Sequence, residues 1–168
     1  MAEVATTVVS SIAAPRKPFY AWLVPGVFYN QLETVLRDAA FMPGVSKTTG
    51  TTGPWDVPGS TRIVHLTDGT SVRETVTSAT APDYFAYKLT EFSNPMIRLL
   101  VKEARGQWWF TDEGTGLRAK WTYTAETKNP LGVILVAPVI KILWNRYMKA
   151  AMTVTRERAE KEVTGSAR

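Results

Sequence analysis

The sequence predicts an α+β fold in which a curved antiparallel sheet of about seven strands wraps round one long C-terminal helix, with two short helices after the first strand. Three patterns indicate this fold. Residues 53–127 form short runs of alternating apolar and polar side chains separated by turn residues, as in an antiparallel meander with one buried face. A Val- and Thr-rich run and two segments with helical spacing come before them. One long apolar segment with helical spacing follows them.

The N-terminal part of the chain contains a predicted strand and two predicted helices. Val and Thr alternate along Ala2–Ile12, which predicts the first strand. Pro15–Leu23 has the composition of a short helix, because proline is favoured in a first turn, and we expect Pro25-Gly26 to end it. Asn30–Phe41 has apolar residues at helical spacing and predicts a second helix, with Asn30 as its N-cap and Pro43-Gly44 after its end.

The first half of the meander predicts three strands. Val45–Thr52 is a polar, Thr-rich strand, and a loop follows it at Gly53–Gly59. Thr61–Thr67 and Thr70–Ala79 are joined by Asp68-Gly69, which is a strong signal for a β-hairpin.

The register of this hairpin decides which side chains share a face. A two-residue turn places four residues on one face: Ile63, His65, Val72 and Glu74. A bulge of one residue brings Val64 and Leu66 to that face in place of Ile63 and His65. The sequence alone leaves both registers open.

The second half of the meander predicts three more strands. Tyr84–Phe92 is followed by a turn at Ser93-Asn94-Pro95, and another strand lies within Leu99–Thr111. A hairpin turn at Glu113–Gly116 leads into Leu117–Thr127, where apolar and charged residues alternate clearly. The alternation predicts one inward face for six aromatic residues: Phe85, Tyr87, Trp108, Phe110, Trp121 and Tyr123.

The final helix is predicted from about Leu131 to Val163, because apolar residues recur there at helical spacing and form a broad stripe. Pro138 lies inside this segment. Proline removes a helical hydrogen bond, so we expect Pro138 to kink the helix early or to divide a short helix from a long one.

Composition limits the range of functions. With 168 residues, the chain has the size of one domain, residues 1–168, and can bury a core without disulfides or metals. It has no cysteine and one histidine, His65, which excludes thiol chemistry and the common zinc sites, so we expect no metal and no cofactor. Acidic residues are interspersed with the basic ones, and the net charge is only +5, which argues against nucleic-acid binding.

The expected location is cytoplasmic. Glu3 stands where a secretory signal would carry positive charge. The longest apolar run, Leu131–Ile140, is too short to span a bilayer and contains Pro138. We therefore expect a soluble protein, monomeric or homodimeric, that makes at most a transient contact with a membrane surface.

Several motifs recur in a fixed order along nearly the whole chain: Ile12–Pro15 after the first strand, Gly59–Arg62 leading into Asp68-Gly69 and Glu74, then Phe85–Tyr87, Gly106–Phe110, Gly116–Trp121 and the final helix. In their order and spacing the chain resembles the START-like (SRPBCC) helix-grip superfamily. It is most similar to the branch described as polyketide cyclase/dehydrase and lipid transport. The resemblance implies a hydrophobic tunnel between the sheet and the long helix. Because this superfamily includes lipid carriers, hormone receptors and aromatase/cyclases, the fold does not imply one function.

The resemblance also implies that the acidic residue at the Glu74 position faces the tunnel, as a polar anchor or as a general acid or base. The alternative is an exposed carboxylate paired with Arg62 or Arg73. His65 is the second candidate acid or base, or else a structural histidine. Arg62 is a candidate for binding a ligand carboxylate through two hydrogen bonds, or for a surface ion pair.

Aromatic residues complete the predicted ligand-binding set. Tyr87, Tyr123 and Tyr147 each combine an apolar ring with a hydroxyl that can orient a ligand, or else they pack in the core. The residues that we expect to contact a ligand are Arg62, Glu74, Phe85, Tyr87, Trp108, Phe110, Trp121, Tyr123, Leu143 and Tyr147. A ligand fits only if the rings line a cavity and do not fill it.

Three functions are compatible with these features. The leading hypothesis is binding or transport of a hydrophobic small molecule, either a lipid or an aromatic polyketide-like compound. The second is a cofactor-independent cyclase or dehydratase that uses Glu74, His65 or a tyrosine as acid or base. The third is a protein-interaction module whose contacts are Trp22 and Trp109.

Overall fold

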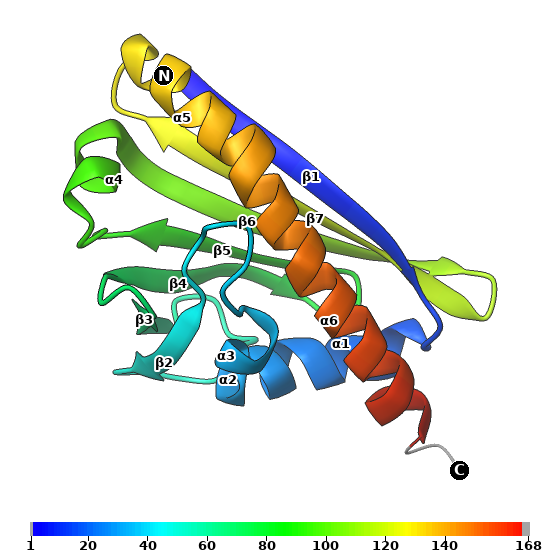
Figure 1. Cartoon of the computed structure of the whole chain (residues 1–168). Helices are drawn as coiled ribbons and strands as arrows, with labels where there is room; N and C mark the ends of the chain where they lie inside the picture. Colours follow the sequence, from blue (N-terminus) through cyan, green and yellow to red (C-terminus); the bar gives the residue numbers. More distant parts are fainter. Residues whose placement is uncertain (1, 166–168) are drawn as a thin grey trace.

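The fold consists of a seven-stranded antiparallel sheet with one long helix across one face (Figure 1). The computed structural model describes residues 2–165. The strands are β1 (Ala2–Ile12), β2 (Val45–Thr49), β3 (Thr61–Leu66), β4 (Ser71–Thr80), β5 (Tyr84–Thr90), β6 (Val101–Glu113) and β7 (Gly116–Thr127). Their order across the sheet is β1-β7-β6-β5-β4-β3-β2, so the first strand lies beside the last. The predicted arrangement of sheet and helix is confirmed.

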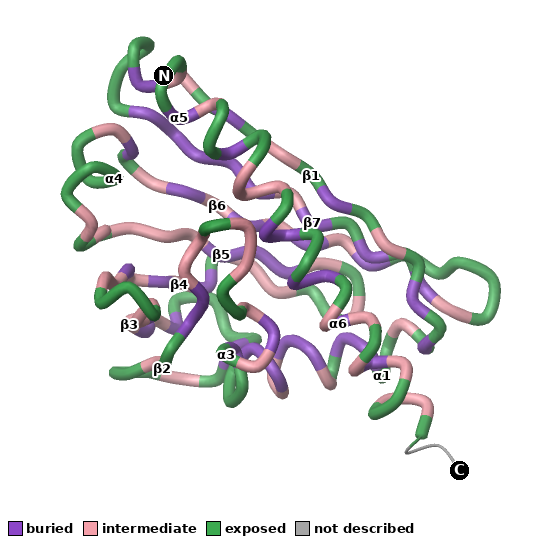
Figure 2. Tube along the Cα trace, viewed as in Figure 1, coloured by how far each residue is buried: buried purple, intermediate pink, exposed green. Residues whose placement is uncertain are grey.

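Short helical segments follow β1, another lies between β5 and β6, and a long helix follows β7. The segments are α1 (Arg16–Trp22), the π-helical turn η1 (Leu23–Val27), α2 (Phe28–Asn30), α3 (Leu32–Val35), α4 (Pro95–Leu100), α5 (Pro130–Pro138), the π-helical turn η2 (Val139–Trp144) and α6 (Asn145–Gly165). The last three are continuous. Buried residues lie on the sheet, on the helical segments that follow β1 and on the side of α6 that faces the sheet, whereas α4 and α5 are largely exposed (Figure 2).

The β3–β4 hairpin closes through three residues, so the two-residue turn is wrong. The Leu66 N–H donates a hydrogen bond to the Thr70 carbonyl (2.8 Å), and Gly69 has a φ of +86°. Glycine adopts this left-handed conformation without steric penalty, which allows a one-residue bulge beside the turn.

The bulge decides which side chains of β3 face the long helix. Arg62 pairs with Glu74, and Val64 pairs with Val72, and all four side chains are buried. His65 lies between these inward positions, so its side chain points to the other face of the sheet. The register with the bulge is therefore confirmed.

Pro25-Gly26 does not end the first helix, contrary to the prediction. The helix continues from α1 through η1 into α2, and Pro25 lies inside the π-helical turn. A π-helical turn is wider than an α-helical one, so it accommodates a proline ring and a missing N–H. A second π-helical turn, η2, follows Pro138 and continues the chain into α6 without dividing the helix.

The second predicted helix, Asn30–Phe41, is wrong over most of its length. Only α3 is helical there, and Asn30 ends α2 instead of capping a new helix. The Asp38 carboxylate accepts hydrogen bonds from the Gly44 N–H (2.6 Å) and the Thr67 hydroxyl (2.5 Å). These bonds offer the chain an alternative to helical pairing and direct it into β2.

The short helix α4 was not predicted, and β6 therefore begins only at Val101. The Asn94 side chain accepts hydrogen bonds from the Met96 and Ile97 N–H groups at 3.0 and 3.2 Å, and Pro95 occupies the first turn. Asn-Pro is also a turn signal. A helix of one and a half turns is too short to show helical periodicity, so the sequence favoured the turn.

Candidate ligand-binding cavity

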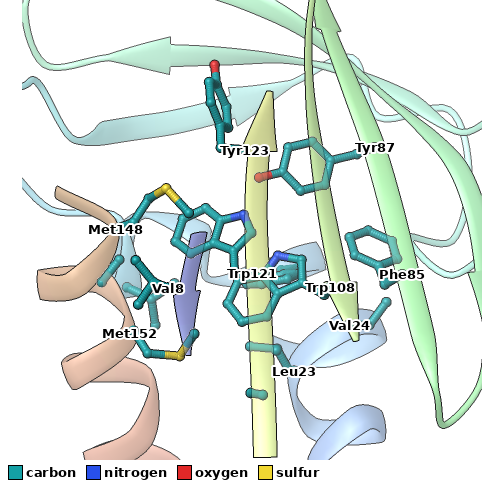
Figure 3. Packing of buried hydrophobic residues seen from close by; sticks show 14 of the residues in the cluster. Val8, Leu23, Val24, Phe85, Tyr87, Trp108, Trp121, Tyr123, Met148 and Met152 are labelled. Atoms are coloured by element: carbon teal, nitrogen blue, oxygen red, sulfur yellow. The ribbon is translucent and has the colours of Figure 1, made fainter. Parts of the chain in front are cut away.

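Side chains fill the half of the space between sheet and helix that lies beside α1, and we call this half the closed end (Figure 3). Trp108 and Trp121 face each other on β6 and β7 and stack with their ring centroids 4.7 Å apart. Phe110 stacks on Trp108 and contacts the rings of Phe19 and Tyr20 from α1, both at 5.7 Å. Rings packed this closely leave little room for a ligand.

The other half, beside α4 and α5, contains two adjoining cavities, and we call it the open end. The outer cavity, of about 400 Å³, lies between α4, the first turns of the long helix and the strands β6 and β7. The inner cavity, of about 300 Å³, extends toward β3, β4 and β5. Five residues line both cavities, which therefore adjoin: Met42, Phe92, Ile97, Tyr123 and Trp144.

The outer cavity is apolar. Ala104 and Ala125, which are paired on β6 and β7, form its floor, and Leu100 and Val136 lie on its sides. No charged side chain of residues 2–165 lines it. Such walls suit the hydrocarbon part of a ligand.

The inner cavity is lined by Glu74 and three tyrosines, Tyr87, Tyr123 and Tyr147, among mostly apolar residues. Four further polar residues also line it: Asp68, Thr70, Ser71 and Asn94. Burial raises the pKa of Tyr87 well above its usual value, and the nearby negative charge of Glu74 adds to this effect. Burial also raises the pKa of Tyr123 and of Tyr147. The three hydroxyls are therefore neutral at ordinary pH and can each donate and accept a hydrogen bond.

Glu74 is held in place by a buried ion pair. The Arg62 Nε donates to Glu74 Oε2 at 2.7 Å, with the two side chains 0% and 8% exposed. The same guanidinium donates to the Phe28 carbonyl and lies over the Trp55 ring, 3.7 Å from its centroid. Because Arg62 lines none of the described cavities, it orients Glu74 and does not reach a ligand there.

Tyr87 owes its position to a glycine on the neighbouring strand. Gly106 pairs with Tyr87 across β5 and β6, and a Cβ built on Gly106 would collide with the Tyr87 ring and hydroxyl. The missing side chain lets the ring lie against β6 with its hydroxyl beside the two tryptophans (Figure 3). A larger residue at position 106 would force the Tyr87 ring out of this place.

A small void of about 20 Å³ connects the polar group to the closed end, and Glu74, Tyr87, Trp108 and Trp121 line it. Among residues 2–165, the indole N–H of Trp108 has no hydrogen-bond partner, and that of Trp121 faces the Tyr87 hydroxyl without reaching full hydrogen-bond geometry. A void of this size accommodates one oxygen-sized group. The inner end of the cavity can therefore hold a hydroxyl or carbonyl oxygen between donors and an acceptor.

The structure separates the predicted ligand-binding residues into three groups. Glu74, Tyr87, Tyr123 and Tyr147 come together at the inner cavity. Trp108 and Trp121 reach only the 20 Å³ void. The remaining four line none of the described cavities: Arg62, Phe85, Phe110 and Leu143. The ligand contacts themselves stay a prediction.

His65 does not join Glu74. Its Nε2 lies 2.8 Å from the Thr49 hydroxyl on β2, on the face of the sheet turned away from the helix. Among residues 2–165, no three side chains able to ligate a metal come together. The two residues named for a protein contact, Trp22 and Trp109, are half-buried, and the Trp22 indole N–H donates to Glu162 (2.7 Å).

Sequence reasoning missed most of the outer cavity. Trp144 lines both cavities and stacks on Tyr147 with ring centroids 4.7 Å apart, and Ile97 lines both cavities from α4. Two signals were available: the Asn94 cap of α4, and the spacing of Ile140, Trp144 and Tyr147 along one helix face.

A curved sheet that grips a long helix over an apolar cavity defines the START-like (SRPBCC) helix-grip class. Residues 29–160 match the family described as polyketide cyclase / dehydrase and lipid transport, and the chain belongs to this family. A comparison with curated proteins by sequence finds no match.

Solved structures with low sequence identity share the fold. Norcoclaurine synthase from Thalictrum flavum, in complex with dopamine and hydroxybenzaldehyde, aligns with a TM-score of 0.73 at 14% identity, over 96% of this chain and 88% of its own. Major latex-like protein 151 from Panax ginseng aligns with a TM-score of 0.64 at 12% identity, over 93% and 97%. A protein from Nitrosospira multiformis aligns with a TM-score of 0.63 at 11% identity, over 99% and 100%.

Proposed function

We propose that this protein binds or carries a hydrophobic small molecule, either a lipid or an aromatic polyketide-like compound, in the open end. The observation that carries this proposal is the pair of adjoining cavities, of about 400 Å³ and about 300 Å³, that share five lining residues. Volumes of this size, with mostly apolar walls and some polar groups, are typical of small-molecule sites. The lipid transport in the family's description supports the same proposal.

The cavity has a polar and an apolar end, which sets the orientation of the ligand. Its hydrocarbon part lies in the outer cavity, where burial contributes about 25 cal/mol per Å². Its polar end lies beside Glu74 and Tyr87. A hydroxyl suits this end better than a carboxylate, because Arg62 is already paired with Glu74 and a second carboxylate would be repelled. Norcoclaurine synthase, which shares the fold, is seen in complex with dopamine and hydroxybenzaldehyde, and this supports a ligand similar in size to these compounds.

The proposal is tested by filling the outer cavity. Ala104 and Ala125 face each other on its floor, so the double variant Ala104→Leu/Ala125→Leu occupies the ligand's place. We expect it to bind the apolar fluorophore N-phenyl-1-naphthylamine at least tenfold more weakly than the wild type. The matched control is Ala150→Leu, at an exposed position of α6, which should leave the affinity unchanged. Equal affinity of the double variant and the wild type, with the fold intact by circular dichroism, would refute the proposal.

A cyclase or dehydratase is a second candidate, favoured by one observation. The Glu74 carboxylate and the Tyr87 hydroxyl both line the inner cavity. A general base and a general acid that act on one substrate need such an arrangement, with Glu74 as the base and Tyr87 as the acid. Tyr87→Phe and Glu74→Gln should then each reduce the turnover of a polyketide-like substrate at least a hundredfold. Because His65 lies on the other face of the sheet, His65→Ala is the matched control. Unchanged turnover in both cavity variants would eliminate this candidate.

The cytoplasmic location and the monomeric or homodimeric state stay predictions. Light scattering coupled to size-exclusion chromatography measures the second directly: a mass of one or two chains supports the prediction, and a larger assembly contradicts it.

A further inference from the structure

An exposed apolar surface surrounds the mouth of the outer cavity. It is built by α4, by α5 with η2, and by the loop 39–43, and we call it the rim. Its largest exposed side chains are Phe41 (98% exposed), Leu131 (73%) and Ile134 (69%), with Met96, Leu99 and Leu135 close behind. Met96 and Leu135 also line the outer cavity from opposite sides, which places α4 and α5 across the mouth from each other. Exposed apolar surface of this extent marks an interaction site.

The charges on the helical part of the rim are basic. The segments 39–47, 92–102 and 128–149 contain seven basic residues and no acidic one. Arg98 on α4 and Lys141 on η2 are exposed beside the apolar side chains, and the Lys128 ammonium donates to the Arg98 carbonyl (2.6 Å). The carboxylates of Asp38 and Asp68 flank the loop of Phe41, so the basic part of the surface lies over α4 and α5.

The helix that forms half of the rim is apolar enough to cross a membrane by composition. The helix Pro130–Gly165 contains a window with a mean hydropathy of 1.4, only 28% of which is buried. Its continuation in α6 is tied to the sheet, because Met148 and Met152 are buried and Asn145 Nδ2 donates to the Thr6 hydroxyl (2.7 Å). The helix cannot enter a bilayer lengthwise without unfolding, but its outer face can lie flat on one.

A basic, apolar face fits one kind of partner best. A second copy of this chain would bring two basic faces together, which is unfavourable. An anionic lipid surface complements the charge and accepts the apolar side chains, and each Lys or Arg strengthens such binding. We propose that the rim docks on an anionic lipid bilayer with the mouth of the outer cavity against the membrane. A hydrophobic ligand then passes between acyl chains and cavity without crossing water.

Vesicle flotation tests docking without any bound ligand, so its outcome is independent of the proposed function. We expect the wild type to float with vesicles of phosphatidylcholine mixed with phosphatidylglycerol and to stay behind with phosphatidylcholine alone. Leu131→Ser/Ile134→Ser and Arg98→Glu/Lys141→Glu should each reduce the bound fraction about tenfold. High salt should release the wild type.

The matched controls are Val57→Ser, an exposed apolar residue in another loop, and Lys161→Glu, near the end of α6. Both should float like the wild type. The charge-reversal pair changes only exposed side chains, so it keeps the test valid if the serine pair does not fold. Absence of wild-type flotation, or equal losses in the controls, would overturn the proposal. Self-association that is lost in Leu131→Ser/Ile134→Ser would overturn it in favour of a second copy.

Discussion

The closed and open ends of the space between sheet and helix differ in the size of the side chains that β6 and β7 send into it. At the closed end Trp108 is paired with Trp121, and the rings stack. At the open end Ala104 is paired with Ala125, and the same two strands form the floor of the outer cavity. The backbone continues the same ladder from one end to the other.

Between the two ends, Gly106 is paired with Tyr123 on β7 and leaves room for Tyr87 from β5. Inward residues therefore change from small to large within a few positions along each strand. A cavity between the sheet and the long helix does not require a different fold. It requires small residues at paired positions of adjacent strands. One end therefore provides stability, and the other provides space.

The largest expected effect follows from truncating the closed end. Phe110→Ala removes a ring with 1% exposure that contacts three other rings, so we expect a loss of about 3–5 kcal/mol in the free energy of unfolding. Ile97→Ala at the open end removes a side chain that already faces the cavity, and should lose less than about 1.5 kcal/mol. Urea unfolding measures both. Equal losses would contradict the division into two ends.

Disrupting the Arg62–Glu74 ion pair, at the boundary between the two ends, should reduce the free energy of unfolding almost as much. Arg62→Met leaves Glu74 buried without its partner, which should reduce the free energy of unfolding by about 3 kcal/mol. In Arg62→Met/Glu74→Leu the unpaired charge is gone, so most of the loss should be recovered. Urea unfolding of the three proteins measures this. If the double variant is less stable than Arg62→Met, the pair stabilises the fold beyond its own desolvation, and this interpretation is wrong.

Replacing Gly106 by a larger residue should reduce the volume of the inner cavity. Gly106→Val adds atoms where the Tyr87 ring lies, so the ring must move into the inner cavity, at a cost of about 1–3 kcal/mol in stability. Binding of N-phenyl-1-naphthylamine should weaken about tenfold. Gly106→Val/Tyr87→Ala should restore binding, since the displaced ring is then absent. Weak binding that persists in the double variant would show that Gly106 acts by another route.

The cavity tyrosines should give the smallest effect, a loss of stability at alkaline pH. Burial raises the folded-state pKa of Tyr87, Tyr123 and Tyr147 above the unfolded value of about 10. Their contribution is complete below that pH and is lost as pH rises toward the folded-state pKa, by at most about 1.4 kcal/mol per pH unit for each tyrosine.

Unfolding free energies between about pH 8 and about pH 11 measure this slope. Tyr87→Phe should make it shallower, and Tyr84→Phe, at a partly exposed tyrosine on β5, is the control. An unchanged slope in Tyr87→Phe would contradict the buried, neutral state of this hydroxyl.

Much of the fold could be predicted, because alternation along a strand depends only on neighbouring residues. The inward set from Phe85 to Tyr123 was predicted from this period, and all six are buried. Errors arose where short-range signals conflicted. Pro25 indicated a helix end, but a π-helical turn accommodated it. At Asp68-Gly69 the sequence left two registers open, and the structure has the one with a bulge. Part of the site followed as well, since Glu74 and three tyrosines do line the inner cavity.

The residue pattern alone predicted the sheet, the long helix and the set of side chains between them. Where that set leaves room depends on pairing across strands: Ala104 against Ala125, Trp108 against Trp121, and Gly106 beneath Tyr87. These residues are distant or unrelated in sequence, and their sizes add only once the register brings them together. The burial of Arg62 with Glu74, and the exposure of an apolar rim at the cavity mouth, depend on tertiary packing for the same reason.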